Sequence, residues 1–186
     1  MLAYVLYSTY VRLWESRRPS GRSAIVVAVA ALLPDLLDKP LAWQLELLPT
    51  GRSLGHSLLF TVPLVVIILL AARRFDAGDV GGAFAIGYLS HLPADAVYPL
   101  VIPGAVVDLG YLIWPFASAG STETSDLLGE VLRLMGDFSL FVSGSDGWRF
   151  LLLEAGLVAL ALGLWIADGR PGLGLIERRL GRQERT

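Results

Sequence analysis

The stretch SLLFTVPLVVIILLAA, residues 57–72, carries no charged side chain and ends at Arg73 and Arg74. A helix needs about 20 apolar residues, within a range of roughly 17–25, to cross a bilayer. Residues 150–167 (FLLLEAGLVALALGLWIA) form a second run near that length, in which Glu154 is the only charged side chain. Both runs indicate helices that span a membrane.

Shorter apolar runs cover residues 1–13, 23–33 and 80–92, and the last of these is rich in glycine, as closely packed membrane helices often are. Of the 186 residues, 54% are hydrophobic and 17% charged, against about 25% charged in an average soluble domain. We therefore predict an all-α, polytopic membrane bundle of four to five apolar helices. Residues 1–167 would form one integral-membrane domain, and residues 168–186 a basic cytoplasmic tail.

The same composition excludes several classes of protein. Too few polar groups are present to cover a free-standing soluble domain, and the apolar runs argue against a disordered chain. No basic face is visible that would bind nucleic acid. The absence of cysteine excludes disulfide scaffolds, thiolate zinc sites and cysteine nucleophiles. A soluble helical bundle, in which the shorter runs would be core helices, is the least favoured alternative because the runs carry so little charge.

Arginines orient the runs, because basic residues gather on the cytoplasmic side of a membrane. They follow the first run, the run at residues 57–72 and the last run, so these three ends are predicted to be cytoplasmic. The assignments agree if residues 97–148 begin and end outside. We therefore expect residues 97–116 to be re-entrant or interfacial, and residues 126–141 to form an amphipathic helix on the outer side.

Five ionisable residues lie at the predicted outer ends of the helices. They occur in the segments LLPDLLDKP, GRSLGHS and GYLSHLPADAV and are Asp35, Asp38, His56, His91 and Asp95. The arginine-based orientation uses none of them, yet it places all five on one side. Ionisable groups at membrane depth are costly and tend to be functional.

Imidazole and carboxylate together suit a divalent ion such as Zn²⁺, Mn²⁺ or Fe²⁺. Catalytic zinc sites usually keep three protein ligands and an open position for water, and such a water, with its pKa near about 7, is a hydrolytic nucleophile. On a helix, Asp35 and Asp38 share a face, as do His91 and Asp95. The sequence therefore predicts a His/Asp metal site.

Each of these residues alone also fits a simpler role. Asp35 could end a helix, and Asp38 could pair with Lys39 or Arg52. Either histidine could be a packed residue with hydrogen-bonded ring nitrogens. Arg52 fits a lipid-headgroup anchor as well as a phosphate clamp.

In these motifs the chain resembles the membrane-bound metal-dependent hydrolase family, the YdjM-like proteins, and particularly its archaeal members. The matching residues are Pro34-Asp35 with Asp38, Arg52 with His56-Ser57, and Gly87 with His91-Leu92 and Asp95. The resemblance covers roughly the first hundred residues. Members usually carry a histidine at the start of the first helix, whereas this chain opens with Met1-Leu2-Ala3-Tyr4. We expect an internal start codon, with the histidine encoded upstream.

The resemblance implies a metal-dependent hydrolase in the cell membrane. The arginine-based orientation places its site at the outer face, and that location would suit a lipid or phosphoester as substrate. The implied metal ligands are Asp35, Asp38, His56, His91 and Asp95, and the implied catalytic or substrate-contacting residues are Asp38, Ser57 and Arg52. Membrane lipid is the expected partner, and nucleic acid is not. The alternative is a non-catalytic membrane protein, a small transporter or scaffold that uses the same residues for ion binding or packing.

Overall fold

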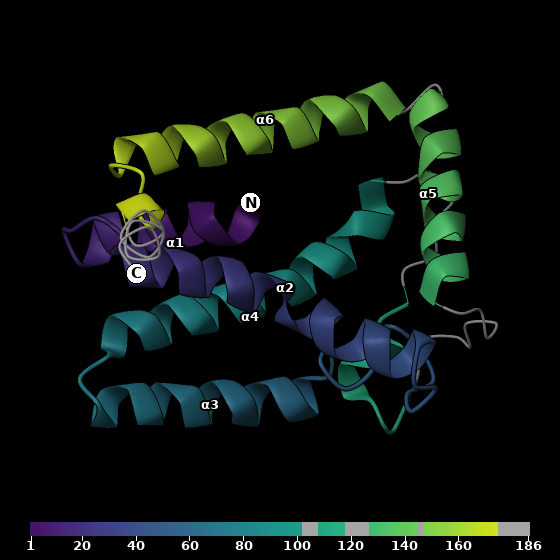
Figure 1. The fold of residues 1–186 in the computed structure, drawn as a ribbon, viewed down its shortest axis with the longest axis horizontal. Helices are drawn as coiled ribbons and strands as arrows, with labels where there is room; N and C mark the ends of the chain where they lie inside the picture. Colours follow the sequence, from purple (N-terminus) through teal and green to yellow (C-terminus); the bar gives the residue numbers. More distant parts are fainter. Residues whose placement is uncertain (102–107, 118–126, 145–146, 175–186) are drawn as a thin grey trace, which may run out of the picture.

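A computed structural model describes residues 1–101, 108–117, 127–144 and 147–174 of the chain. Within these residues the regular elements are six α-helices and one 3-10 helix, with no strand. They are α1 (Leu2–Trp14), α2 (Gly21–Trp43), α3 (Leu58–Arg74), α4 (Gly78–Val101), η1 (Gly110–Ile113), α5 (Leu127–Ser143) and α6 (Gly147–Ala167). The predicted all-α class is confirmed for the described part of the chain (Figure 1).

Serines cap the starts of α2 and α3, and arginines lie at the end of α3. The Ser20 and Ser57 hydroxyls cap α2 and α3, each accepting a backbone N–H of the first turn at 3.1 and 3.2 Å. Arg73 and Arg74 occupy the last turn of α3, where a cation is favoured by the helix dipole. The arginines that predict a cytoplasmic helix end therefore also help to end the helix.

One end of the bundle joins α1 to α6 through a buried carboxylate. Asp168, directly after α6, accepts hydrogen bonds from Tyr4 and Ser8 at 2.7 Å and from the Arg12 Nε at 2.9 Å. Its side chain is fully buried. Because three side chains of α1 bond to Asp168, this contact ties the first helix to the last.

The starts of α2 and α4 meet at the same end of the bundle. Asp79 accepts the Ser20 and Ser23 hydroxyls at 3.2 and 2.9 Å, and its carbonyl accepts the Tyr7 hydroxyl at 3.3 Å. Figure 1 shows the arginine-bearing end of α3 here as well, followed by the short turn into α4. The helix ends that the arginines predict to be on one side of the membrane thus lie at one end of the bundle (Figure 1).

The contact between α2 and α4 is the most extensive of the fold and depends on a glycine. A Cβ atom at Gly87 would lie 2.7 Å from the Val27 carbonyl oxygen and 2.9 Å from the Ala30 Cβ. Tyr88 and Leu92 of α4 are buried with Ala30 beside this contact. The backbones approach so closely only because position 87 has no side chain.

The helix α2 continues through Pro34 to Trp43 and so extends beyond the apolar run of residues 23–33. A proline removes one helical N–H and crowds the preceding turn, but neighbouring groups in a bundle can bond the carbonyls that are freed. At this turn the Ala31 carbonyl accepts a hydrogen bond from His91 Nδ1 at 2.8 Å. Asp35 and Asp38 therefore project from a helix, not from a loop.

The helix α4 likewise runs through Pro93 to Val101, so it takes up the start of the run predicted as re-entrant or interfacial. Residues 110–113 of that run form η1, and residues 102–107 lie outside the described part. The amphipathic helix predicted over residues 126–141 is confirmed as a helix, α5. It crosses the end of the bundle opposite the arginines (Figure 1).

Among the described residues, α6 is the one helix long and apolar enough to cross a membrane by length and composition. The helix α3 is apolar but has 17 residues, and α2 and α4 carry the charged candidate-site residues near their C-terminal ends. Large apolar side chains are nonetheless exposed along α2 and α3, among them Val29, Leu32, Leu36, Ile67 and Leu70.

We predict that Gly87→Ala destabilises the fold by about 1–3 kcal/mol, because the added methyl group overpacks the contact between α2 and α4. Thermal unfolding of the detergent-solubilised protein measures this as a lower Tm. Gly82→Ala is the matched control, because it lies on the same helix with no atom within 4 Å of the added Cβ. Equal melting temperatures for the two variants would contradict the close approach at position 87.

Candidate metal centre

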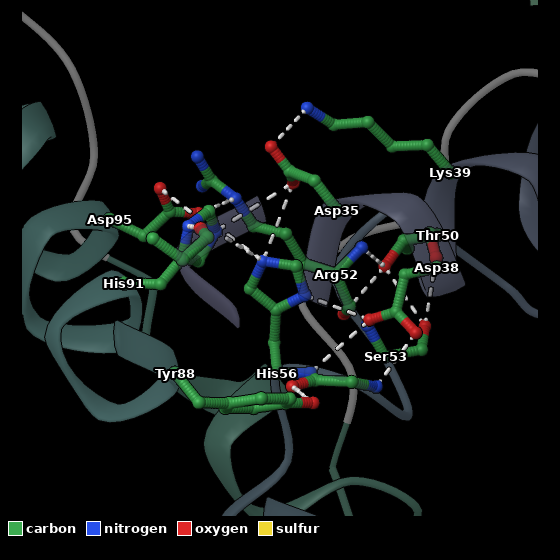
Figure 2. Close-up of polar contacts among 12 residues, drawn as sticks. Asp35, Asp38, Lys39, Thr50, Arg52, Ser53, His56, Tyr88, His91 and Asp95 are labelled. Atoms are coloured by element: carbon green, nitrogen blue, oxygen red, sulfur yellow. Dashed lines mark hydrogen bonds and ion pairs between the residues drawn. The ribbon is translucent and has the colours of Figure 1, made fainter. Parts of the chain in front are cut away.

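Three segments bring a compact cluster together at the end of the bundle opposite the arginines. Asp35 comes from α2, His56 from the loop of residues 44–57, and His91 from α4. One carboxylate oxygen and one ring nitrogen from each histidine all lie within 4.8 Å of one another. Figure 2 shows the two rings meeting between Asp35 and Asp95. The chain thus assembles a group that could hold a metal ion.

The distances within the cluster are those of ligands around one ion. The Nε2 atoms of His56 and His91 are 3.2 Å apart, and Asp35 Oδ1 lies 3.6 and 3.8 Å from them. Asp95, predicted as a ligand, lies beside this group of three, with its oxygens 3.6 Å from His56 Nε2 and 3.8 Å from His91 Nε2. Two ligands at 2.0–2.1 Å from a tetrahedral zinc ion would lie about 3.3–3.4 Å apart.

The hydrogen bonds of the other ring nitrogens explain why these Nε2 atoms face each other. His91 Nδ1 lies 2.8 Å from the Ala31 carbonyl and His56 Nδ1 lies 2.8 Å from Asp38 Oδ2. Both partners accept hydrogen bonds, so in the neutral tautomers each Nδ1 carries the proton and each Nε2 presents a lone pair. Two lone pairs and a carboxylate oxygen that converge on one point need a positive charge between them, which a proton on one Nε2 or a bound cation supplies. This donor set fits a divalent ion.

Asp38 orients His56 from the far side of the ring and does not face the other ligands (Figure 2). Its side chain is fully buried. Besides the His56 ring, it accepts the backbone N–H groups of Ser53 and Gly55 at 2.7 Å and of His56 at 3.3 Å. Asp38, predicted as a metal ligand, thus contacts the ring nitrogen of His56 that faces away from the cluster, a position from which a carboxylate orients a histidine and raises the basicity of its ring.

Gly55 allows the loop to lie against α2. A Cβ atom there would be 2.9 Å from the Pro34 carbonyl oxygen and 3.1 Å from the Pro34 Cα. The Gly55 carbonyl in turn accepts the Tyr88 hydroxyl of α4 at 2.8 Å. His56 is therefore positioned by both helices that supply the other ligands.

Ser57 lies outside the cluster. Its hydroxyl caps α3 and donates to the Trp114 carbonyl at 2.7 Å, and the residue is 1% exposed. Both functions of the hydroxyl group are in use, which explains a serine after His56 without any contact with substrate. The catalytic role predicted for Ser57 has no geometric support in this arrangement.

Lys39 and Arg52, which the sequence offers as partners of Asp38, pair instead with Asp35 and Asp95. Lys39 Nζ lies 2.7 Å from Asp35 Oδ2, and Arg52 Nε lies 2.9 Å from Asp95 Oδ2. The chain has no lysine other than Lys39. Each acid that faces the histidines therefore also contacts a cation at the edge of the site.

Sequence reasoning missed one aromatic residue of the site. Tyr111 in η1 is 1% exposed and packs edge-on against the His56 ring, with centroids 6.0 Å apart. The Arg52 guanidinium lies 5.8 Å from the centre of the same tyrosine ring. Burial raises the pKa of Tyr111, so its hydroxyl keeps its proton at neutral pH. No motif marks this residue, because it comes 55 positions after His56 and reaches the site only through tertiary packing.

A family model described as YdjM inner membrane protein matches residues 1–169 of the chain. The match includes every residue of the cluster and all of α6. No curated protein and no solved structure matches the chain.

We predict that the purified protein binds about one divalent ion per chain, as a single His/carboxylate site would. The double substitution His56→Ala with His91→Ala should abolish binding. Asp38→Asn should weaken it by about 10–100-fold, because an uncharged amide has only one acceptor atom for the His56 ring and the loop N–H groups. Elemental analysis and metal titration measure both effects.

The control for this experiment is Asp137→Asn. Its carboxylate is 63% exposed on α5 and pairs with Arg133, away from the cluster. It should retain full metal content. Unchanged metal content in the double histidine variant would show that any ion binds elsewhere.

Proposed function

The chain belongs to the YdjM inner membrane protein family, and from its His/Asp cluster we propose that it is a membrane-bound metal-dependent hydrolase acting on a lipid or phosphoester. The observation that carries the proposal is the pair of Nε2 atoms 3.2 Å apart, each presenting a lone pair toward an aspartate oxygen. Such a preorganised group is expensive to build without an ion to neutralise it.

The lengths of the helices support a polytopic arrangement. At 1.5 Å per residue, α2 and α4 are about 35 Å long, α6 about 32 Å and α3 about 26 Å, against about 30 Å for the apolar core of a bilayer. We propose that these four cross the membrane, with α1 beside them. By the positive-inside rule, the arginine-bearing end is cytoplasmic and the metal centre lies at the outer face.

A bound ion would supply a Lewis acid and an activated water at neutral pH. His56, His91 and Asp35 would hold it. Of the remaining carboxylates, Asp95 is placed to act as general base, because its side chain is 22% exposed whereas that of Asp38 is fully buried. A base must reach the proton that it removes, and only Asp95 combines access with proximity to the histidines.

A transporter would need ionisable groups along a path through the bilayer. In the described residues the polar clusters lie instead at the two ends of the bundle, around Asp168 and around His56. Between them, α2 and α4 meet through Val27, Ala30, Gly87 and Tyr88. This separation favours the hydrolase over the transporter.

We predict that the metal-loaded protein hydrolyses phosphoester or lipid ester substrates presented in detergent micelles. A chelator should abolish turnover and added divalent metal should restore it. Asp95→Asn should keep its metal but lower kcat by about 10²–10⁴-fold, because the general base is lost. Arg74→Gln, at the opposite end of the bundle, should leave kcat unchanged. Metal-loaded protein that turns over no ester, or turnover that survives chelation, would contradict the hydrolase proposal.

A further inference from the structure

We propose that Lys39 and Arg52 form a cationic rim that binds the phosphate group of the ligand, so that the metal centre takes a phosphate ester in preference to a carboxylic ester. The inference rests on the proposed metal site and deepens it by naming the chemical class of the substrate. It assigns to Lys39, which pairs with Asp35, a role in binding the ligand.

The positions of the two cations follow from Asp35 and Asp95, because each carboxylate faces both the histidines and one cation. Asp35 turns Oδ1 toward the histidines and Oδ2 toward Lys39, at 2.7 Å. Asp95 lies between the histidines and Arg52, whose Nε is 2.9 Å away. Figure 2 shows the ends of both cationic side chains on the side of the His56 ring where Asp35 and Asp95 lie. A ligand that reaches the ion from that side would meet both cations.

An aromatic ring supports each cation in place. Lys39 Nζ lies 5.8 Å from the centre of the Trp43 ring, and the Arg52 guanidinium lies 5.8 Å from that of Tyr111. Cations at this distance are attracted to the face of the ring. Both side chains are therefore partly ordered before any ligand arrives, which lowers the entropic cost of binding.

Exposure separates the rim from the ligands beneath it. The side chains of Lys39 and Arg52 are 37% and 41% exposed, whereas that of His56 is fully buried. The terminal nitrogens of Arg52 donate no hydrogen bond to the residues that the structure describes. A planar guanidinium with two terminal donor groups suits the paired oxygens of a phosphate.

The balance of charge selects for an anion only when metal is bound. Three carboxylates (Asp35, Asp38 and Asp95) and two cations leave the cluster with one net negative charge when the histidines are neutral. A divalent ion would change this to one net positive charge. A phosphate anion gains from the ion and from both cations, whereas a neutral carboxylic ester gains nothing from the rim before it reacts.

The reaction that follows balances as a hydrolysis. The oxygen of water forms a bond to phosphorus, and the bond between phosphorus and the ester oxygen breaks. The electron pair of that bond stays with the departing alcohol oxygen, which takes the proton released by the water. The rim would stabilise the negative charge on the phosphoryl oxygens throughout.

Titration calorimetry with inorganic phosphate tests the rim apart from turnover. Metal-loaded wild type should bind phosphate, and chelated protein should not. Lys39→Gln with Arg52→Gln should lower the affinity by about 10–100-fold per cation lost, while elemental analysis shows unchanged metal content. Arg149→Gln is the matched control, since it removes an exposed cation beside Trp148 at the start of α6.

Equal phosphate affinity in wild type and the double variant would overturn the inference, as would equal affinity with and without metal. If phosphate binds through the rim but no ester is hydrolysed, the hydrolase proposal fails and the rim stands. Competition distinguishes the source of the phosphate: phosphatidic acid in micelles displaces it if the ligand is a lipid headgroup, and soluble phenyl phosphate displaces it if the ligand is a free ester.

Discussion

The buried carboxylate of Asp38 is the contact on which the candidate site depends. It accepts the His56 ring and three backbone N–H groups of the loop that precedes α3. An ionised carboxylate removed from water costs several kcal/mol unless its oxygens are satisfied, and here donors from one loop satisfy both. Because Asp38 lies on α2, the contact also fixes the loop to that helix. One residue thereby determines the path of the loop and the tautomer of a ligand.

The long helix α2 makes this arrangement possible. Asp35 and Asp38 are three residues apart on one helical face, yet one faces the cluster directly and the other reaches it through His56. The turn around Pro34 supplies the Ala31 carbonyl that orients the second histidine. Pro34 therefore lies at the site, between Ala31, which bonds to His91, and Asp38, which bonds to His56.

The sequence alone predicts that Asp35, His56 and His91 lie together and that the helix ends are grouped, because both depend on local patterns. Arginines after apolar runs group the helix ends, and two histidines next to acids in a cysteine-free chain leave few other metal donors. It does not predict that α2 passes through Pro34, because the tendency of proline to end a helix is overcome by tertiary contacts. Nor does it predict Tyr111 at His56 or the acids that Lys39 and Arg52 choose, since these depend on distances between segments far apart in the chain.

The charged clusters at the two ends of the bundle differ in how their charges are paired. Asp168 with Arg12 at one end is a closed pair, whose carboxylate is fully buried and fully bonded. At the other end the acids Asp35 and Asp95 are shared between histidines and cations, and unlike Asp168 their own side chains are partly exposed. The apolar contact at Gly87 lies between the two ends and keeps them apart. The buried pair of Asp168 and Arg12 holds helices together, whereas the proposed binding of an ion and then of an anion needs accessible acids and cations, which the described residues provide around His56.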